Sequence, residues 1–182
     1  MTSQIKYNDL SSVSQVIIMA SPNTEFMDEV AAYGGGDVKM CFQCGTCTAS
    51  CPSGKLTSYR TRKLMRMAQL GLKEEAIGSE DLWMCTTCYA CQERCPRGVP
   101  IVDVVIALRN IAVAEGHMYE AHKKTADALA KYGHAVSVND SVKKMRTDLG
   151  LPEIPPTVLA NPKAKKDLDK ILTVTGFDKI TG

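Results

Sequence analysis

The eight cysteines of the chain fall into two short runs with one shared pattern, which limits the fold more than any other feature. Cysteines stand at positions i, i+3, i+6 and i+10 of each run, and a proline directly follows the last one. The second run repeats the first with an offset of 44 residues, and no cysteine lies outside the two runs. The sequence therefore predicts a duplicated binding unit. The runs comprise Cys41, Cys44, Cys47 and Cys51 before Pro52, and Cys85, Cys88, Cys91 and Cys95 before Pro96.

Cysteines grouped in this way indicate metal or redox chemistry rather than a disulfide framework. The sequence contains no apolar run near the ~20 residues that a transmembrane helix needs. It also lacks the pattern of a signal peptide. We therefore expect a cytoplasmic protein with no membrane span. A formal net charge of +2 over 182 residues gives no indication of nucleic-acid binding, which requires a clustered basic surface.

The spacing within each run suits a cluster larger than a single ion. Three thiolates at i, i+3 and i+6 can surround a compact iron–sulfur cube from one tight loop. Gly45 lies inside the first loop, where the backbone needs a positive φ or a close approach to a sulfide. The proline after the fourth cysteine fixes φ and turns the chain out of the loop. The competing interpretation is a pair of zinc sites, but the usual zinc-knuckle spacing is not met.

Each run resembles the cysteine run of bacterial ferredoxins that carry two [4Fe–4S] clusters, in which the fourth cysteine ligates the cluster of the other run. The resemblance implies that one cluster is held by Cys41, Cys44, Cys47 and Cys95. It implies that the other is held by Cys85, Cys88, Cys91 and Cys51. Because no cysteine of the eight is missing, two four-iron cubes are expected. We predict no catalytic residue.

Apolar residues recur at helical spacing around both runs, so we expect a mostly α-helical protein. The linker from Lys55 to Ala76 is predicted to be helical, punctuated by Gly71 and Gly78, and a strong helix is predicted from Pro100 to Glu115. Its apolar face comprises Ile101, Val104, Val105, Leu108, Ile111 and Ala112. Outside this core, helices are predicted at 23–33, 119–132, 140–149 and 161–172, with an extended segment at 151–156.

These segments predict three parts of the chain. An N-terminal helical extension covers residues 1–36, a helical ferredoxin domain with two [4Fe–4S] clusters covers 37–116, and a helical and extended docking arm covers 117–182. The flanking parts are too small to fold as independent domains.

Other chemically active side chains have simpler explanations. The three histidines lack the spacing of metal ligands and are expected at the surface: His117, His122 and His134. A basic group in the linker forms either a solvated helix face or a docking patch for an acidic partner: Arg62, Lys63 and Arg66. Large side chains flanking the second run are expected to shield a cluster from water: Trp83, Met84 and Tyr89.

The stretch from Met40 to Gly54 resembles the C subunit of the heterodisulfide reductase of methanogenic archaea, and the stretch from Trp83 to Pro96 resembles its second motif. The resemblance implies a subunit without a substrate site. Such a subunit relays electrons from the flavin-carrying A subunit to the catalytic B subunit, which reduces the mixed disulfide of coenzyme M and coenzyme B. A hydrogenase or formate dehydrogenase is implied as a further partner.

Two other classes of electron-transfer protein remain as alternatives. The iron–sulfur subunits of succinate dehydrogenase, fumarate reductase and glycolate oxidase share the helical ferredoxin, so the chain could serve another flavin-linked oxidoreductase. The succinate dehydrogenase class is disfavoured because no further cysteines exist for an N-terminal [2Fe–2S] domain. A free ferredoxin-like carrier is disfavoured by the near-neutral charge and the long flanking segments.

Overall fold

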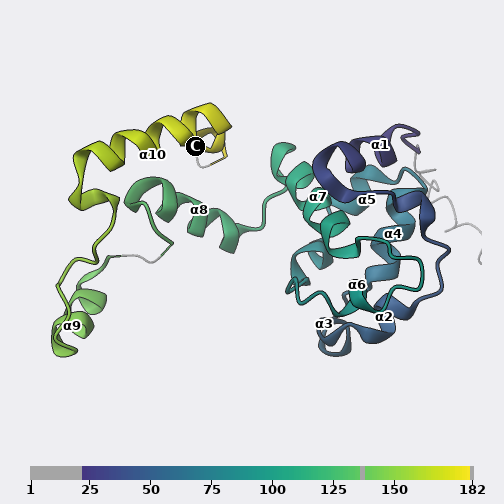
Figure 1. Ribbon diagram of the computed structural model, residues 1–182, viewed down its shortest axis with the longest axis horizontal. Coiled ribbons are helices and arrows are strands. Elements are labelled where there is room, and N and C mark those ends of the chain that lie inside the picture. The colour runs from purple at the N-terminus through teal and green to yellow at the C-terminus, as the bar shows by residue number, and fades with distance from the viewer. Residues whose placement is uncertain (1–21, 136–137, 181–182) are drawn as a thin grey trace, which may run out of the picture.

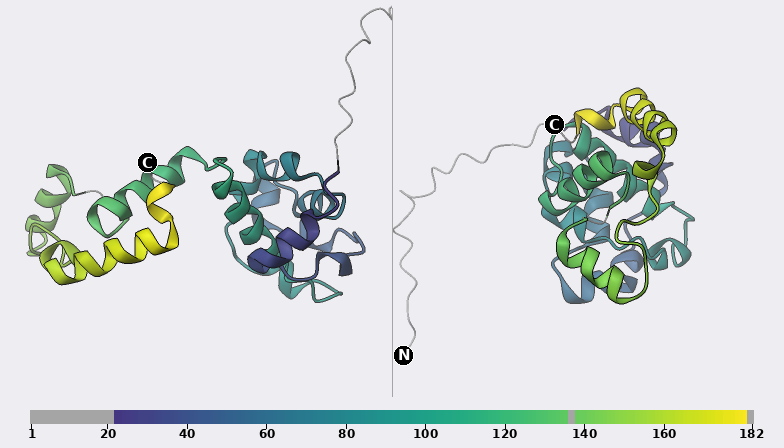
Figure 2. Two further views of the ribbon diagram at one scale, coloured as in Figure 1. Left: turned by 90° about the horizontal axis from the view of Figure 1, so that it is seen from above. Right: turned by 90° about the vertical axis from the view of Figure 1, so that its left-hand side faces the viewer.

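A computed structural model describes residues 22–135 and 138–180, which are mostly α-helical and contain no strand. The chain forms a body made of residues 22–116 and an arm that extends from the end of the body (Figures 1 and 2). Within the two described ranges, no helix is long and apolar enough to cross a bilayer. The N-terminal residues before 22 lie outside the described part, as does that portion of the predicted N-terminal extension.

The helices of the body are short except for the last one, and two 3-10 turns precede the two cysteine runs. The turns are Val38–Met40 and Glu80–Met84. The helices are α1 (Phe26–Val30) with a π-helical turn (Ala31–Gly35), α2 (Thr46–Ser50), α3 (Pro52–Leu56), α4 (Thr61–Gln69), α5 (Lys73–Ile77), α6 (Ala90–Glu93) and α7 (Ile101–Ala114).

The linker between the cysteine runs is helical, as predicted, and is divided among α3, α4 and α5, with a break between α3 and α4 that was not predicted. The backbone is extended at both Thr57 and Arg60. The Arg60 guanidinium donates to the carbonyl oxygens of Gly54, Thr57 and Tyr59, each at 2.8 Å. These bonds satisfy carbonyls that a continuous helix would have paired internally. Gly71, with a φ of +68°, separates α4 from α5.

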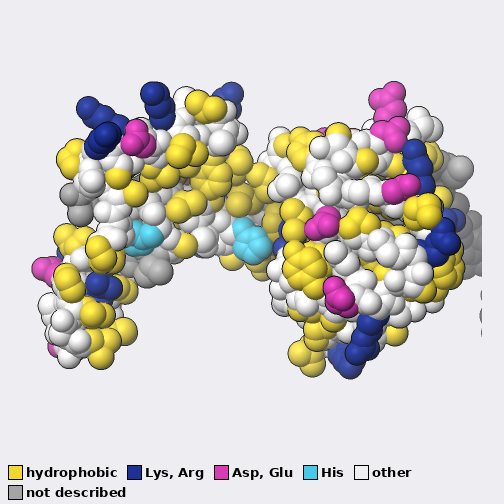
Figure 3. Space-filling view, in the orientation of Figure 1, with side chains coloured by type: hydrophobic (Ala, Val, Ile, Leu, Met, Phe, Trp, Pro, Cys, Tyr) yellow, Lys and Arg dark blue, Asp and Glu magenta, His cyan; other side chains and the backbone are white. Residues whose placement is uncertain are grey.

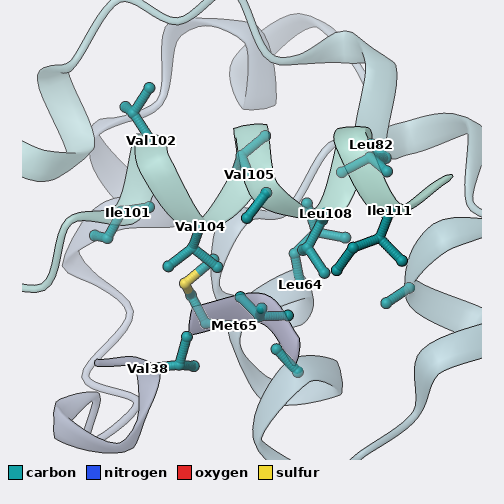
Figure 4. Packing of buried hydrophobic residues seen from close by; sticks show 14 of the residues in the cluster. Val38, Leu64, Met65, Leu82, Ile101, Val102, Val104, Val105, Leu108 and Ile111 are labelled. Carbon is teal, nitrogen blue, oxygen red and sulfur yellow. The ribbon is translucent and has the colours of Figure 1, made fainter. Parts of the chain in front are cut away.

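Helix α7 forms the centre of the hydrophobic core (Figure 4). All six residues of its predicted apolar face are buried, which confirms that prediction. Val102 and Ala107 are buried too, so the core surrounds more than one side of the helix. Val104 points toward Met65 of α4. Each fully buried aliphatic side chain contributes about 1.5–3 kcal/mol, so α7 holds the shorter helices together.

The described part of the N-terminal segment packs against α7. Phe26 and Val30 are completely buried in the same cluster as the α7 side chains. The helix begins at Phe26, later than the predicted start near residue 23. Asn23 lies before the helix and forms a turn, in which its side chain accepts a hydrogen bond from the Glu25 N–H at 2.9 Å. The boundaries at residues 36 and 116 stay predictions.

The arm consists of α8 (Glu120–Tyr132), α9 (Asp140–Asp148) and α10 (Pro162–Thr175), which confirms the three predicted helices. Asn161 caps α10 by accepting hydrogen bonds from the N–H groups of Lys163 and Ala164, so the helix begins at the predicted place. Gly133 ends α8 in the left-handed conformation. Residues 151–156 between α9 and α10 are not helical, as predicted.

Aromatic rings form a contact between the arm and the body. The Trp83 and His122 rings meet edge to face, with their centroids 5.0 Å apart. Few side chains of the arm are buried, among them Ala126 and Leu172. Lys and Arg side chains gather along the outer side of α10 (Figure 3). The arm therefore exposes much of its side-chain surface.

Candidate iron–sulfur centre

The two cysteine loops share one backbone conformation. In the first loop, the residues on either side of the second cysteine have positive φ angles: Gln43 at 65° and Gly45 at 88°. In the second loop, the equivalent residues are Thr87 at 51° and Tyr89 at 63°. The sequence duplication thus extends to the backbone, and the positive φ predicted for Gly45 is confirmed. Sequence reasoning missed the other three residues, although the 44-residue offset relates Tyr89 to Gly45.

The loops also share a gradient of burial. Helices α2 and α6 begin one residue before the third cysteine of each run, and Cys47 and Cys91 are buried at 7% and 8% exposure. The second cysteines, Cys44 and Cys88, are exposed. Burial raises the pKa of the Cys91 thiol to about 11, with further contributions from Cys85 and Cys47. Burial also raises the pKa of Cys47. The helices that carry the two buried thiols, α2 and α6, pack against each other.

A small, narrow cavity is lined by cysteines from both runs. The last cysteine of the first run shares it with the first three cysteines of the second run: Cys51, Cys85, Cys88 and Cys91. Helix α3 begins at the proline after Cys51, and the Gly54 N–H donates to the Cys51 Sγ at 3.4 Å. Cys95, the counterpart in the second run, is half-buried and packs against the core.

Two buried hydroxyl groups also line this cavity. Thr61 is completely buried, and its Oγ1 has no hydrogen-bond partner among the residues that the structure describes. Tyr59 is 1% exposed, and burial, with Cys85 adding to the effect, raises the pKa of its hydroxyl. A buried hydroxyl without a partner is costly. The thiolates and sulfides of an iron–sulfur cluster could accept hydrogen bonds from these hydroxyl groups. The polar groups that line the cavity therefore suit a bound cluster.

Gln69, at the end of α4, holds the start of the first cysteine loop. Its amide donates to the carbonyl oxygens of Cys41 at 2.6 Å and Val38 at 3.1 Å. Its own oxygen accepts from the Gln43 amide at 3.0 Å, and the same Gln43 nitrogen lies 3.6 Å from the Cys41 Sγ. Hydrogen bonds to cluster sulfurs tune the reduction potential. Gln69 therefore positions both Cys41, a proposed cluster ligand, and the Gln43 amide that contacts the Cys41 sulfur.

Arg109 of α7 holds the second loop in the same way. Its guanidinium donates to the carbonyl oxygens of Cys85 at 2.6 Å and Leu82 at 3.0 Å. These carbonyls are the 44-residue equivalents of those bound by Gln69. Arg109 also lies over the Trp83 ring, 5.6 Å from its centroid. Sequence reasoning missed Gln69 and Arg109. The available signal for Arg109 was a basic residue within the largely apolar run of α7.

The remaining predicted residues are placed as follows. Among the residues that the structure describes, no three His, Cys, Asp or Glu side chains are arranged to hold a single metal ion. His122 contacts two aromatic rings. Trp83 and Met84 pack at the edge of the core, while Tyr89 lines the cavity and is 44% exposed. Shielding by Tyr89 is therefore partial.

Comparisons with known proteins agree with this arrangement. Residues 37–99 match the family model of the 4Fe-4S dicluster domain. The chain is 47% identical to the C subunit of the H(2):CoB-CoM heterodisulfide,ferredoxin reductase of Methanothermobacter thermautotrophicus, over 95% of this chain and 94% of that protein. It is 53% identical to the iron-sulfur C subunit of the CoB--CoM heterodisulfide reductase of Methanopyrus kandleri, over 80% and 76%.

A third relative extends the comparison to another genus. The chain is 42% identical to the C subunit of the Ferredoxin:CoB-CoM heterodisulfide reductase of Methanosarcina mazei, over 86% of this chain and 97% of that protein. The matches include both cysteine loops and reach into the flanking helices. The chain belongs to the family of heterodisulfide reductase C subunits.

Proposed function

We propose that this chain is the electron-transfer subunit of a cytoplasmic CoB–CoM heterodisulfide reductase and holds two [4Fe–4S] clusters. Family membership supports this function over that of a component of a fumarate- or glycolate-oxidising complex, because the relatives described above are subunits of heterodisulfide reductases. The match to a dicluster domain and the two equivalent loops support a count of two clusters.

The proposed ligands cross between the two runs. The first-run cluster takes Cys41, Cys44, Cys47 and Cys95, and the second-run cluster takes Cys85, Cys88, Cys91 and Cys51. The observation that carries this assignment is the cavity in which Cys51 meets the first three cysteines of the second run. It supports the second-run set directly, and the internal duplication extends the same rule to Cys95.

The residues of the chain would ligate, insulate and connect the clusters. A bound [4Fe–4S] cluster supplies reversible one-electron redox chemistry. Contact between α2, which carries Cys47, and α6, which carries Cys91, would bring the two clusters near one another and shorten the path between them. Helix α7 and the residues packed around it exclude water from one side of the site. The chain contributes no catalytic residue in this proposal, and the bond chemistry belongs to a partner.

The proposed partners are the flavin-carrying A subunit of the complex and its catalytic B subunit, which reduces the mixed disulfide of coenzyme M and coenzyme B. A hydrogenase or formate dehydrogenase would supply electrons. The relative from Methanococcus maripaludis is the C2 subunit of an H(2)/formate:CoB-CoM heterodisulfide,ferredoxin reductase, which supports such donors. The arm, residues 117–182, is proposed to dock a partner, and residues 37–116 are proposed to form the ferredoxin domain.

Native mass spectrometry of the complex, isolated from its host without oxygen, tests this proposal. We expect the chain to carry eight iron atoms. We also expect it to be found in a complex with two other proteins, one that carries flavin and one that carries further iron–sulfur clusters. Freeze-quench spectra should show that the clusters of the chain are reduced rapidly by electrons from the flavin protein. Isolation of the chain alone with two clusters would point to a free carrier instead, and zinc in place of iron would overturn the proposal.

A further inference from the structure

A groove lies beside the first cysteine loop, between that loop, α1 and α4. It combines exposed apolar side chains with a concentration of positive charge. Phe42 is 60% exposed and Leu70 is 43% exposed, and both line the groove with Met67. Three adjacent cations of α4 complete this surface: Arg62, Lys63 and Arg66.

These three cations are available to a partner. All three are exposed, and their side chains make no hydrogen bond or ion pair within the described ranges. Two further cations of the groove are already used, since Lys39 pairs with Asp28 at 3.1 Å and Arg60 binds three backbone carbonyls. No Asp or Glu from the described part of the chain lines the groove. A whole-chain net charge of only +2 makes this local excess notable.

The groove also reaches a proposed cluster ligand. Cys41 and Gln43 line it together with Phe42, which projects from the loop between them. A molecule seated there would touch the loop of the first-run cluster. Aromatic residues, Met and Arg are enriched in protein interfaces, where they provide most of the binding energy.

We propose that this groove is the docking surface for an acidic segment of the protein partner that exchanges electrons with the first-run cluster. This inference rests on the proposed function, because it places a partner beside a cluster. Carboxylates of the segment would pair with the α4 cations, and its apolar side chains would cover Phe42 and Leu70. Opposite charges steer association and make it depend on salt.

A charge-reversal pair with a matched control tests the surface. The test variant is Lys63→Glu with Arg66→Glu. The control is Lys55→Glu with Arg94→Glu, which changes the charge equally at exposed cations that lie near other cysteines but outside the groove. Each variant is expressed in the host with a tag, and the complex is captured without oxygen at several salt concentrations.

At physiological salt, the amount of partner protein captured with the test variant should be about tenfold lower than with the unmodified chain. The difference should shrink at high salt. The control should retain normal amounts. Iron content and cluster spectra should match in all three chains. In the unmodified complex, a zero-length carbodiimide should join the Lys63 amine to an Asp or Glu of a partner.

Equal retention by both variants, or equal loss from both, would overturn the assignment of this groove. So would partner crosslinks that avoid Lys63. Loss of a bound flavin or nucleotide with full retention of protein would assign the groove to a small anion and also overturn it. Failure of the proposed function would be distinct, since it would show as missing iron in the unmodified complex.

Discussion

The guanidinium of Arg109 donates a hydrogen bond to the carbonyl oxygen of Cys85 at 2.6 Å, as the amide of Gln69 does to that of Cys41 at the same distance. The two cysteines are the first of their runs, 44 residues apart. The Arg109 guanidinium carries a positive charge, whereas the Gln69 amide is neutral. The two loops are therefore alike in backbone and different in electrostatics.

Replacing Arg109 with Gln should lower the reduction potential of the second-run cluster. A positive charge stabilises the more negative reduced state, so its removal favours the oxidised state. We expect a shift on the order of 50 mV, the size that about 1 kcal/mol gives a one-electron couple. A spectroscopic redox titration of the holoprotein measures it. Arg109→Lys, which keeps the charge, should shift much less, and equal shifts in both variants would contradict this explanation.

Thr61→Val should lower the potential of the same cluster without loss of iron. The substitution removes a buried hydroxyl that has no protein partner in the cavity and preserves the shape of the side chain. One lost hydrogen bond of about 1 kcal/mol again corresponds to tens of millivolts. Thr61→Ser, which keeps the hydroxyl, serves as the control in the same titration. An unchanged potential in Thr61→Val would show that the hydroxyl does not contact the cluster.

The equivalent positions Gly45 and Tyr89 should respond differently to substitution. Gly45→Ala places a side chain at a φ of 88° and should destabilise the holoprotein by about 1–2 kcal/mol. Tyr89→Gly relieves the same kind of strain at a φ of 63°, partly offset by the greater freedom of glycine in the unfolded chain, and should stabilise by less than about 1 kcal/mol. The stabilities of the two variants are compared by following the loss of cluster absorbance during denaturation with guanidinium. Equal damage from both would contradict the strain argument.

Lys73 should stabilise the body in a pH-dependent way. Its ammonium bonds to Glu115 and, at 2.9 Å, to Glu29, joining α5 to the end of α7 and to α1. These bonds, that to Glu115 first, raise the pKa of Lys73. A raised pKa gives a contribution that is complete below the ordinary lysine value of about 10.4 and is lost as the pH rises through the folded value.

Lys73→Met should therefore cost on the order of 1 kcal/mol at about pH 8, and the cost should shrink above about pH 11. Chemical denaturation of both proteins at the two pH values measures the difference. A cost that is the same at both would show that packing of the side chain, rather than its charge, is responsible.

The elements predicted from sequence are those whose signals are local. Helices α7, α8 and α10 each combine a long periodic run with a Gly or Asn at an end, so propensity and capping agree with the tertiary structure. The break between α3 and α4 depends on Arg60 binding three carbonyls. Periodicity does not report such contacts, so this break could not be predicted from the spacing of apolar residues.

The candidate site was predictable to a similar degree. Cysteine spacing predicts the two loops, and Gly45 predicts one left-handed residue. The side chains of Gln69 and Arg109 donate hydrogen bonds to carbonyl oxygens 28 and 24 residues earlier in the chain. No rule of sequence spacing predicts such contacts. The placement of Cys51 beside the second run came from a resemblance to ferredoxins, and the cavity supports it independently.

Spectra of single-cysteine variants test the crossed ligand sets most directly. Each variant of the anaerobic holoprotein should damage one cluster and leave the spectrum of the other. We predict that Cys51→Ala leaves the same intact spectrum as Cys88→Ala, and that Cys95→Ala leaves the same one as Cys44→Ala. If Cys51→Ala instead matched Cys44→Ala, each run would hold its own cluster and the crossed assignment would be wrong.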